Sequence, residues 1–232
     1  MLLEVKDLGA GYQKKQVIYN VSLAVDKAEI VSLIGHNGGG KTTTLKATFG
    51  LLKPFSGKIV YDGKDITGRP AAVNVKEGLA FVPQEKALFP HLSVLDNLRM
   101  GAYTIGSSVD FDSRLADIYQ LFPVLEKRAG QRAGTLSGGE RKMLALGMAL
   151  VRQPKALFLD EPSLGLSPVL AQQLGDTFQT IQRQGTAILL VEQNVKLAMR
   201  VAHRVYVMKT GCIILEDSGE KLRQRGEWWD LF

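Results

Sequence analysis

The sequence predicts an α/β fold whose core is interrupted by a helical insertion. The first third of the chain is rich in strand-like segments, the middle third shows helical periodicity, and the last third alternates strand-like and helical segments. A length of 232 residues suits one globular unit, or one unit with an inserted subdomain.

The first third is expected to form strands. Residues 2–7 and 17–25 alternate apolar and polar side chains, which is the pattern of half-buried strands. Residues 30–34 form a short apolar run of the kind found in buried strands. Asp62-Gly63, between two strand-like arms, predicts a tight hairpin.

Helices are expected for most of the segment from residue 93 to residue 152. One helix face is indicated by four apolar side chains at i, i+3, i+4 and i+7: Leu115, Ile118, Tyr119 and Phe122. Pro123 is expected to end or interrupt that helix, because proline cannot donate a backbone hydrogen bond.

The last third returns to strands. Residues 156–159 and 187–191 are expected to be buried parallel strands, with a helix over 169–183 between them. The segments 204–208 and 212–216 flank a Lys-Thr-Gly turn and are expected to form a second hairpin.

Composition and charge limit the function classes. The net charge is +6 without any run of five basic residues, so a solvated basic surface with a phosphate site is favoured over a dedicated nucleic-acid face. The apolar runs fall far short of the roughly 20 residues that a membrane-spanning helix needs. The single cysteine, Cys212, excludes an internal disulfide, and we identify no export signal at the N-terminus. Together these features favour the cytoplasm.

A glycine-rich loop at residues 35–42 fits the pattern G-x-x-x-x-G-K-[ST] and follows a strand-like run. Glycines let the backbone turn its N–H groups toward phosphate oxygens, and a helix that begins after the loop favours an anion at its N-terminus. Lys41 is expected to reach the β- and γ-phosphates of ATP, and the Thr42 hydroxyl to ligate Mg²⁺. The nucleotide-binding residues expected here are Gly35, Asn37, Gly38, Gly40, Lys41, Thr42 and Thr43.

Two adjacent carboxylates, Asp160 and Glu161, follow the apolar run at 156–159. In parallel α/β sheets, sites lie at the carboxyl ends of strands. Asp160 is expected to support Mg²⁺, directly or through water, which leaves Glu161 free to orient and deprotonate an attacking water. Taken alone, the pair could also be an acidic loop start.

A second glycine motif is Leu136-Ser137-Gly138-Gly139-Glu140, which precedes a helical segment. Ser137 and Glu140 fit a capping box, so the motif can be interpreted as a well-capped helix start. Two adjacent glycines in a first turn disfavour a helix, however, and they favour close approach of a ligand to backbone N–H groups. Two anion sites and one acidic pair in one chain suggest that two copies share each nucleotide.

These motifs, in this order and spacing, resemble those of ABC ATPases over nearly the whole chain. The loop at 35–42 resembles Walker A, and Asp160-Glu161 resembles Walker B with its catalytic glutamate. Residues 136–140 resemble the signature motif, so Ser137, Gly138, Gly139 and Glu140 are expected to bind nucleotide.

Three further segments carry the resemblance. Phe81-Val82-Pro83-Gln84 resembles the Q-loop, which makes Gln84 a further expected Mg²⁺ ligand. Residues 163–166 resemble the D-loop. Tyr12 stands where the family stacks an aromatic ring on adenine, although from the residues alone it is more plausibly a strand-end tyrosine.

The resemblance implies a P-loop NTPase fold with a mainly parallel core sheet, an antiparallel β subdomain and an inserted helical subdomain. It implies a single ABC ATPase domain over residues 1–232. The core with the antiparallel β subdomain would comprise residues 1–84 and 153–232, and the helical subdomain residues 85–152.

Partners and location are also implied by the resemblance. Two ATPase subunits, identical or related, would form a head-to-tail dimer that sandwiches each ATP between one phosphate loop and the other subunit's signature. Membrane permease subunits would dock on the Q-loop and helical subdomain, at the cytoplasmic face of the inner or plasma membrane. A solute-binding protein would be an indirect partner, and no nucleic acid is expected.

One position departs from the general family pattern. Most ABC ATPases place a histidine after the strand that ends near residue 191, whereas this chain has Gln193. Glutamine can donate a hydrogen bond but cannot become cationic, so Gln193 is expected to position groups in catalysis and not to relay a proton. Residues 191–195 and 160–168 closely resemble ATPase subunits of branched-chain amino acid importers, with urea and amide importers as an alternative.

The class-level rival is an ABC ATPase that acts on nucleic acid or ribosomes. The short separation between Gln84 and Ser137 leaves no room for the long coiled coils of the chromosome-maintenance members. The cargo cannot be read from these residues, because the ATPase does not touch it. Trp228-Trp229 near the C-terminus is expected to be a folded-back tail or a docking surface.

Overall fold

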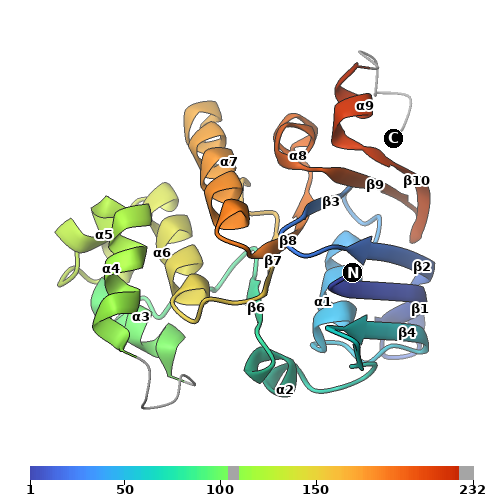
Figure 1. Cartoon of the computed structure of the whole chain (residues 1–232), viewed down its shortest axis with the longest axis horizontal. Coiled ribbons are helices and arrows are strands. Elements are labelled where there is room, and N and C mark those ends of the chain that lie inside the picture. Colours follow the sequence, from blue (N-terminus) through green and yellow to red (C-terminus); the bar gives the residue numbers. More distant parts are fainter. Residues whose placement is uncertain (104–109, 225–232) are drawn as a thin grey trace.

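The computed structural model describes residues 1–103 and 110–224, and its centre is a six-stranded sheet (Figure 1). In spatial order the strands are β10 (Cys212–Ser218), β9 (Arg204–Lys209), β3 (Ile30–Gly35), β8 (Ala187–Glu192), β7 (Ala156–Asp160) and β6 (Leu79–Val82). All neighbours are parallel except β10, which pairs antiparallel with β9. The predicted mainly parallel core sheet is therefore confirmed.

The three central strands are buried along their full length. Every residue of β3, β7 and β8 is buried. Strands covered on both faces read as continuous apolar runs, which is why these three were visible in the sequence. The hairpin predicted between the last two strands is also confirmed, with Lys209 paired to Cys212 around its turn.

A second, antiparallel sheet contains four strands. Its spatial order is β2 (Lys15–Val25), β1 (Leu3–Tyr12), β4 (Ser56–Tyr61) and β5 (Lys64–Asp65). The Asp62-Gly63 hairpin is confirmed, and both turn residues have left-handed φ angles of 47° and 77°. Strand β1 continues past the predicted residues 2–7 to Tyr12. The prediction stopped short because a register shift beside Asp7 breaks the alternation of apolar and polar side chains there.

The helices fall into two groups along the chain. Between residues 94 and 150 lie α3 (Val94–Ala102), α4 (Phe111–Leu121), α5 (Pro123–Lys127), the 3₁₀ helix η1 (Ala133–Thr135) and α6 (Gly138–Leu150). Along the rest of the chain lie α1 (Lys41–Phe49), α2 (Ala71–Lys76), α7 (Pro168–Arg183), α8 (Val195–Val201) and α9 (Gly219–Gln224). The first group lies at the end of the molecule away from the four-stranded sheet, with α7 between it and α8 (Figure 1).

The helical predictions are confirmed where the helical pattern of apolar residues extends over several turns. The segment from residue 93 to 152 is mainly helical over its described residues, α4 ends at Leu121, and Pro123 opens α5. Helices α2, α8 and α9 were not predicted, because six or seven residues are too few for a helical period to stand out. The proposed boundaries between core and helical subdomain stay a prediction.

Two apolar cores lie on opposite faces of the six-stranded sheet. Ile30 and Ile34 pack with the α3–α6 group and with α7–α9, whereas Val31 and Leu33 pack toward α1 and the four-stranded sheet. Alternate residues of one strand thus fix both layers. Because β3, β6, β7 and β8 run parallel, their carboxyl ends meet at one edge of the sheet, where the expected site residues begin. In residues 1–103 and 110–224, no helix is long and apolar enough to span a membrane.

Candidate functional site

The glycine-rich loop connects β3 to α1. Gly40 is the N-cap of α1 with a φ of 105°, and an added Cβ would lie 2.7 Å from the Ile18 side chain, so only glycine fits there. Gly38 has a φ of 78° and faces open space, which leaves its backbone accessible to a ligand. The loop geometry therefore suits an anion at the N-terminus of α1.

Lys41 lies beneath this loop and is buried. Its Nζ donates to the carbonyl oxygens of Gly35 at 2.9 Å and His36 at 3.1 Å, and it lies 3.5 Å from Oε1 of Glu161. The carbonyl bonds hold the ammonium group in place, and the Glu161 carboxylate partly balances its charge. A phosphate entering the loop would meet a cation that is already positioned.

Thr42 and Asp160 meet at the other side of the loop. Oγ1 of Thr42 donates to Oδ1 of Asp160 at 2.8 Å. Burial raises the pKa of Asp160, the Thr42 hydroxyl opposes that rise, and the nearby Glu161 carboxylate adds to it. A hydroxyl oxygen beside a carboxylate is a donor set that Mg²⁺ accepts, so these residues fit the ion that the sequence predicts.

Glu161 is held in a strained backbone conformation. Its φ is 46°, in the left-handed region, and its N–H donates to the Val191 carbonyl of the neighbouring strand at 2.9 Å. The side chain is buried between Lys41 and Gln84, whose Nε2 donates to Oε2 at 3.1 Å. Lys41 and Gln84 therefore fix the Glu161 carboxylate, while β8 fixes the Glu161 backbone.

A cavity of about 370 Å³ joins these groups. It is lined by Asn37, Gly38, Gly40, Lys41, Thr42, Thr43, Gln84, Glu161 and Gln193, with Val17 and Leu164 at its apolar side. The structure thus brings together the phosphate loop, the Q-loop glutamine, the acidic strand end and the glutamine that follows β8. Tyr12 lies outside this lining, half-exposed at the end of β1.

The second glycine motif lies at the start of α6 and contributes no residue to that cavity. The predicted capping box is confirmed: the Ser137 N–H donates to Oε2 of Glu140 at 2.8 Å, and the Glu140 N–H donates to Oγ of Ser137 at 3.3 Å. These bonds with Ser137 lower the pKa of Glu140, and the nearby Arg128 lowers it further.

The two glycines of this motif have different reasons to be glycine. An added Cβ on Gly139 would lie 3.1 Å from Leu170 of α7, so packing within the chain favours a glycine there. An added Cβ on Gly138 would meet none of the described residues within 4 Å. Packing therefore gives Gly139 a reason to be glycine that Gly138 lacks, and the approach of a ligand to either residue stays a prediction.

Glu192 is a site residue that the sequence reasoning did not single out. It is 1% exposed, and its carboxylate accepts from the Ser163 N–H and Oγ, each at 2.9 Å, and from the Asn194 N–H at 3.2 Å. Burial raises the pKa of Glu192, and the Ser163 bonds oppose that rise. This carboxylate ties the loop after Glu161 to the end of β8. The available signal was an acidic residue ending a fully buried apolar strand.

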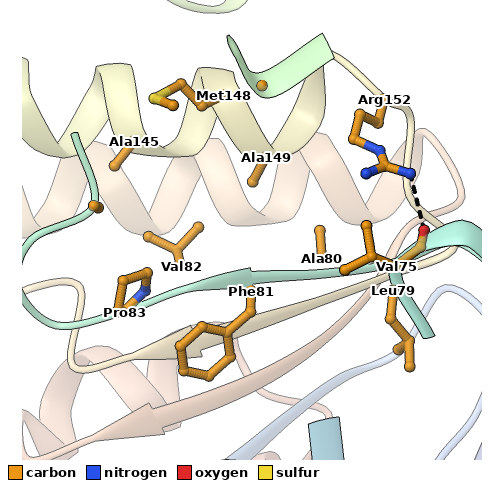
Figure 2. Close-up of a pocket in the computed structure, with 12 residues that line it drawn as sticks. Val75, Leu79, Ala80, Phe81, Val82, Pro83, Ala145, Met148, Ala149 and Arg152 are labelled. Atoms are coloured by element: carbon orange, nitrogen blue, oxygen red, sulfur yellow. Dashed lines mark hydrogen bonds between the residues drawn. The ribbon is translucent and has the colours of Figure 1, made fainter. Parts of the chain in front are cut away.

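A second, apolar groove is lined by residues of β6, α6 and Pro83 of the Q-loop. Val82 and Ala80 of β6 point toward Ala145 and Ala149 of α6 (Figure 2). Figure 2 also shows Phe81 pointing to the opposite side of the strand, where its ring lies 5.2 Å from that of Phe49. Alternation along β6 thus points Ala80 and Val82 toward α6 and Phe81 toward Phe49 of α1.

Arg152 lines this groove, and exposed apolar side chains lie close in sequence to other residues that line it. Arg152 at the end of α6 donates to the Val75 carbonyl of α2 at 3.0 Å (Figure 2). On α2, or on and just after α3, three large apolar side chains are exposed: Val73, Met100 and Tyr103. Apolar side chains gathered around a groove favour contact with another protein.

The family model described as "ABC transporter" matches residues 18–164, which cover the phosphate loop, the signature and the acidic pair. The chain belongs to the ABC transporter family. It is an ATP-binding subunit of that family and an ABC transporter ATPase, as the sequence motifs implied.

Among its relatives is the high-affinity branched-chain amino acid transport ATP-binding protein BraG of Pseudomonas aeruginosa, which is 41% identical over 95% of this chain and 94% of its own length. The probable branched-chain amino acid transport ATP-binding protein LivF of Archaeoglobus fulgidus is 37% identical, over 100% of this chain and 98% of its own length. The lipopolysaccharide export system ATP-binding protein LptB of Haemophilus influenzae is 32% identical, over 95% and 92%.

Solved structures agree with the fold. A nucleotide-free ATP-binding cassette from an ABC transporter has a TM-score of 0.87 and 26% identity, covering 97% of this chain and 94% of that one. A cassette solved as a dimer in a post-hydrolysis state with ADP and Pi has a TM-score of 0.84 at 21% identity, over 94% and 98%. The second likeness supports the ABC ATPase fold.

Proposed function

We propose that this ABC ATPase hydrolyses ATP with Mg²⁺ to power a membrane importer, and that its cargo is branched-chain amino acids. The observation that carries the proposal is the convergence of Lys41, Thr42, Gln84, Glu161 and Gln193 on one cavity at the carboxyl edge of the parallel sheet. Each supplies a group that phosphoryl transfer to water requires.

The arrangement assigns a role to each group. Backbone N–H groups of the loop and the Lys41 ammonium bind the phosphates, with Lys41 giving up its contact with Glu161 as they enter. Glu161, freed from that contact, orients a water and accepts its proton. Thr42, Asp160 and Gln84 would hold Mg²⁺, which supplies charge neutralisation of the phosphates. Gln193, at the cavity wall, hydrogen-bonds the terminal phosphate and keeps it aligned.

The complete site needs a second subunit in this proposal. Ser137–Glu140 contributes nothing to the cavity of its own chain, yet Gly138 leaves the start of α6 open to an incoming group. A head-to-tail dimer would bring these N–H groups onto the ATP of the other subunit. The second subunit is an identical copy or a related ATPase.

The hydrolysis step is tested with Glu161→Gln. We expect this variant to bind ATP, to lose turnover, and to accumulate as a closed dimer detectable by light scattering in the presence of ATP. The matched control is Glu4→Gln on β1, which makes the same chemical change outside the cavity and should hydrolyse ATP normally. Wild-type turnover by Glu161→Gln would remove Glu161 from the role of base.

The shared site is tested with Gly138→Ala. A methyl group there meets no atom within 4 Å in residues 1–103 and 110–224, and alanine is the better helix former, so thermal stability should hold or rise. Turnover should nevertheless fall, because the methyl group would stand between the N–H groups of α6 and the partner's ATP. Unchanged turnover with unchanged cooperativity in ATP would argue against a site shared between subunits.

The groove of Figure 2 is proposed to receive a short helix from a permease subunit at the cytoplasmic face of the membrane. Its apolar floor suits one face of an amphipathic helix. Met100→Glu, beside the lining residue Gly101, should abolish co-purification with the permease, whereas Ile214→Glu on β10, equally an exposed apolar site, should not. A solute-binding protein would then be an indirect partner.

Two alternatives remain for the cargo and class. A urea, amide or other small-solute importer would have the same site, and binding of amino acids or amides to the partner solute-binding protein separates these cases. An ABC ATPase acting on nucleic acid or ribosomes would bind RNA with a steep salt dependence and would capture no permease. The branched-chain importer is favoured because two relatives that cover nearly the whole chain carry that description.

A further inference from the structure

Lys142 on α6 is joined to the proposed catalytic glutamate through one residue. Its Nζ donates to the backbone carbonyl of Gln84 at 3.0 Å. The side-chain amide of the same Gln84 donates to Oε2 of Glu161 at 3.1 Å. A hydrogen-bonded path thus runs from α6, through the Q-loop, to the proposed base.

The surroundings of Lys142 make this contact costly to break. The residue is only partly exposed, and its stem lines a small apolar space with Phe122, Leu166 and Leu170. Burial lowers the pKa of the Lys142 ammonium, and four carboxylates oppose that fall: Glu192, Glu85, Asp160 and Glu161. A half-buried ammonium needs an acceptor, and the Gln84 carbonyl supplies it.

Lys142 also stands close to the signature motif, two residues after Glu140 on the same helix. The first turn of α6 would meet the partner subunit's ATP, and the next turn carries the contact with Gln84. A rigid helix passes a displacement at one turn directly to the next. Any shift of the signature motif would therefore move the carbonyl that sets the position of the Gln84 side chain.

We propose that Lys142 is a positioning residue that couples the signature motif of one subunit to the Gln84–Glu161 pair of its own site. The proposal rests on the function proposed above for Glu161 and the signature. Lys142 does not touch the reacting atoms. It holds the Q-loop backbone so that the Gln84 side chain keeps its hydrogen bond to Glu161. When α6 moves, Lys142 moves the Gln84 backbone with it.

The experiment compares steady-state ATP hydrolysis by Lys142→Met, Lys142→Arg and Lys142→Gln with that of wild type. Methionine keeps the apolar stem and removes the donor. We expect kcat to fall roughly tenfold, the change produced by loss of one charge-assisted hydrogen bond, with KM within about twofold. Arginine should restore kcat to within about threefold, and glutamine, one bond shorter, should fall between methionine and wild type.

Two further measurements separate positioning from general stability. Lys155→Met is the matched control, because Lys155 pairs with Asp62 on the surface, away from the cavity. Its kcat should match wild type. In a Gln84→Ala background, Lys142→Met should cause no further loss of kcat, because the side chain that Lys142 positions is already absent.

Some outcomes would overturn the proposal. A kcat for Lys142→Met within twofold of wild type would do so, as would losses that multiply with those of Gln84→Ala. Should Lys142→Met fail to fold, equal kcat values for Lys142→Gln and wild type would serve as the refutation. Normal turnover by Glu161→Gln would instead refute the proposed function, so the two failures are distinguishable.

Discussion

Gly211 connects the last hairpin to the phosphate loop, and its replacement by alanine is a demanding test of this architecture. Its N–H donates to the Gly39 carbonyl at 2.9 Å, and its own carbonyl accepts from the Tyr19 N–H at 2.9 Å. Its φ is 82°, and an added Cβ would lie 2.2 Å from the Val17 carbonyl oxygen. One residue therefore holds β2, the β9–β10 turn and the loop in register.

The magnitude follows from comparison with Gly63, which has a φ of 77° and nothing within 4 Å of an added Cβ. Both alanine variants incur the left-handed backbone cost of about 1–2 kcal/mol. Gly211→Ala must also move the turn away from Val17, with strain of about 1–3 kcal/mol and loss of backbone hydrogen bonds worth about 1 kcal/mol each. We expect about 4 kcal/mol for Gly211→Ala and about 1 kcal/mol for Gly63→Ala.

Two measurements test this difference: the Tm of each variant without nucleotide, and its affinity for ATP by titration. At about 2–4 °C per kcal/mol for a chain of this size, Tm should fall by roughly 12 °C in Gly211→Ala and by about 3 °C in Gly63→Ala. ATP affinity should fall only in Gly211→Ala, because the Gly39 carbonyl loses its donor. Equal Tm shifts, or unchanged ATP affinity in Gly211→Ala, would refute the reasoning.

Three further predictions concern single side chains. Tyr12→Ala should weaken ATP binding about fivefold, the low end of base stacking for a half-exposed ring, while Tyr12→Phe keeps the affinity; equal affinities in an ATP titration would exclude stacking. Gln193→Ala should slow hydrolysis more than it weakens ATP binding, and an unchanged rate would make the side chain a bystander. Burial raises the folded-state pKa of Glu192 above its ordinary 4.5. In the pH range between the unfolded-state and folded-state pKa, ionisation of Glu192 therefore costs the folded state more free energy than the unfolded state. As pH rises through this range, wild type should lose stability relative to Glu192→Gln in urea unfolding; a growing wild-type advantage would contradict this.

The sequence predicted the parts of the fold whose signals are local. Strands β3, β7 and β8 read as apolar runs because both of their faces are covered, and the hairpin at Asp62-Gly63 reads from its turn residues. The strand order could not be read in this way. It depends on which apolar faces pack together, and those pairings join segments far apart in the chain.

The same distinction holds within the site. Lys41, Thr42, Asp160 and Glu161 belong to motifs that were visible as short runs of sequence. Residues of the phosphate loop, the Q-loop, the acidic pair and the segment after β8 line one cavity. The contact of Lys142 with Gln84 joins residues separated by 58 positions and carries no local pattern. Glu192 likewise looked like the polar end of a strand until its three donors, two of them from Ser163, were known.

The second glycine motif shows how the structure sharpens the case for a shared site. Sequence alone treated Gly138 and Gly139 as equivalent, and a capped helix start explained them nearly as well as a ligand did. The packing of Gly139 against Leu170 is a sufficient reason for glycine at that position, so Gly139 adds little to the case for a ligand. Gly138 is left with neither a packing neighbour nor a left-handed φ to account for it. Gly138 lowers helix propensity at an open helix start and gains no packing contact from the described part of the chain, which supports the proposal that another subunit brings a group to it.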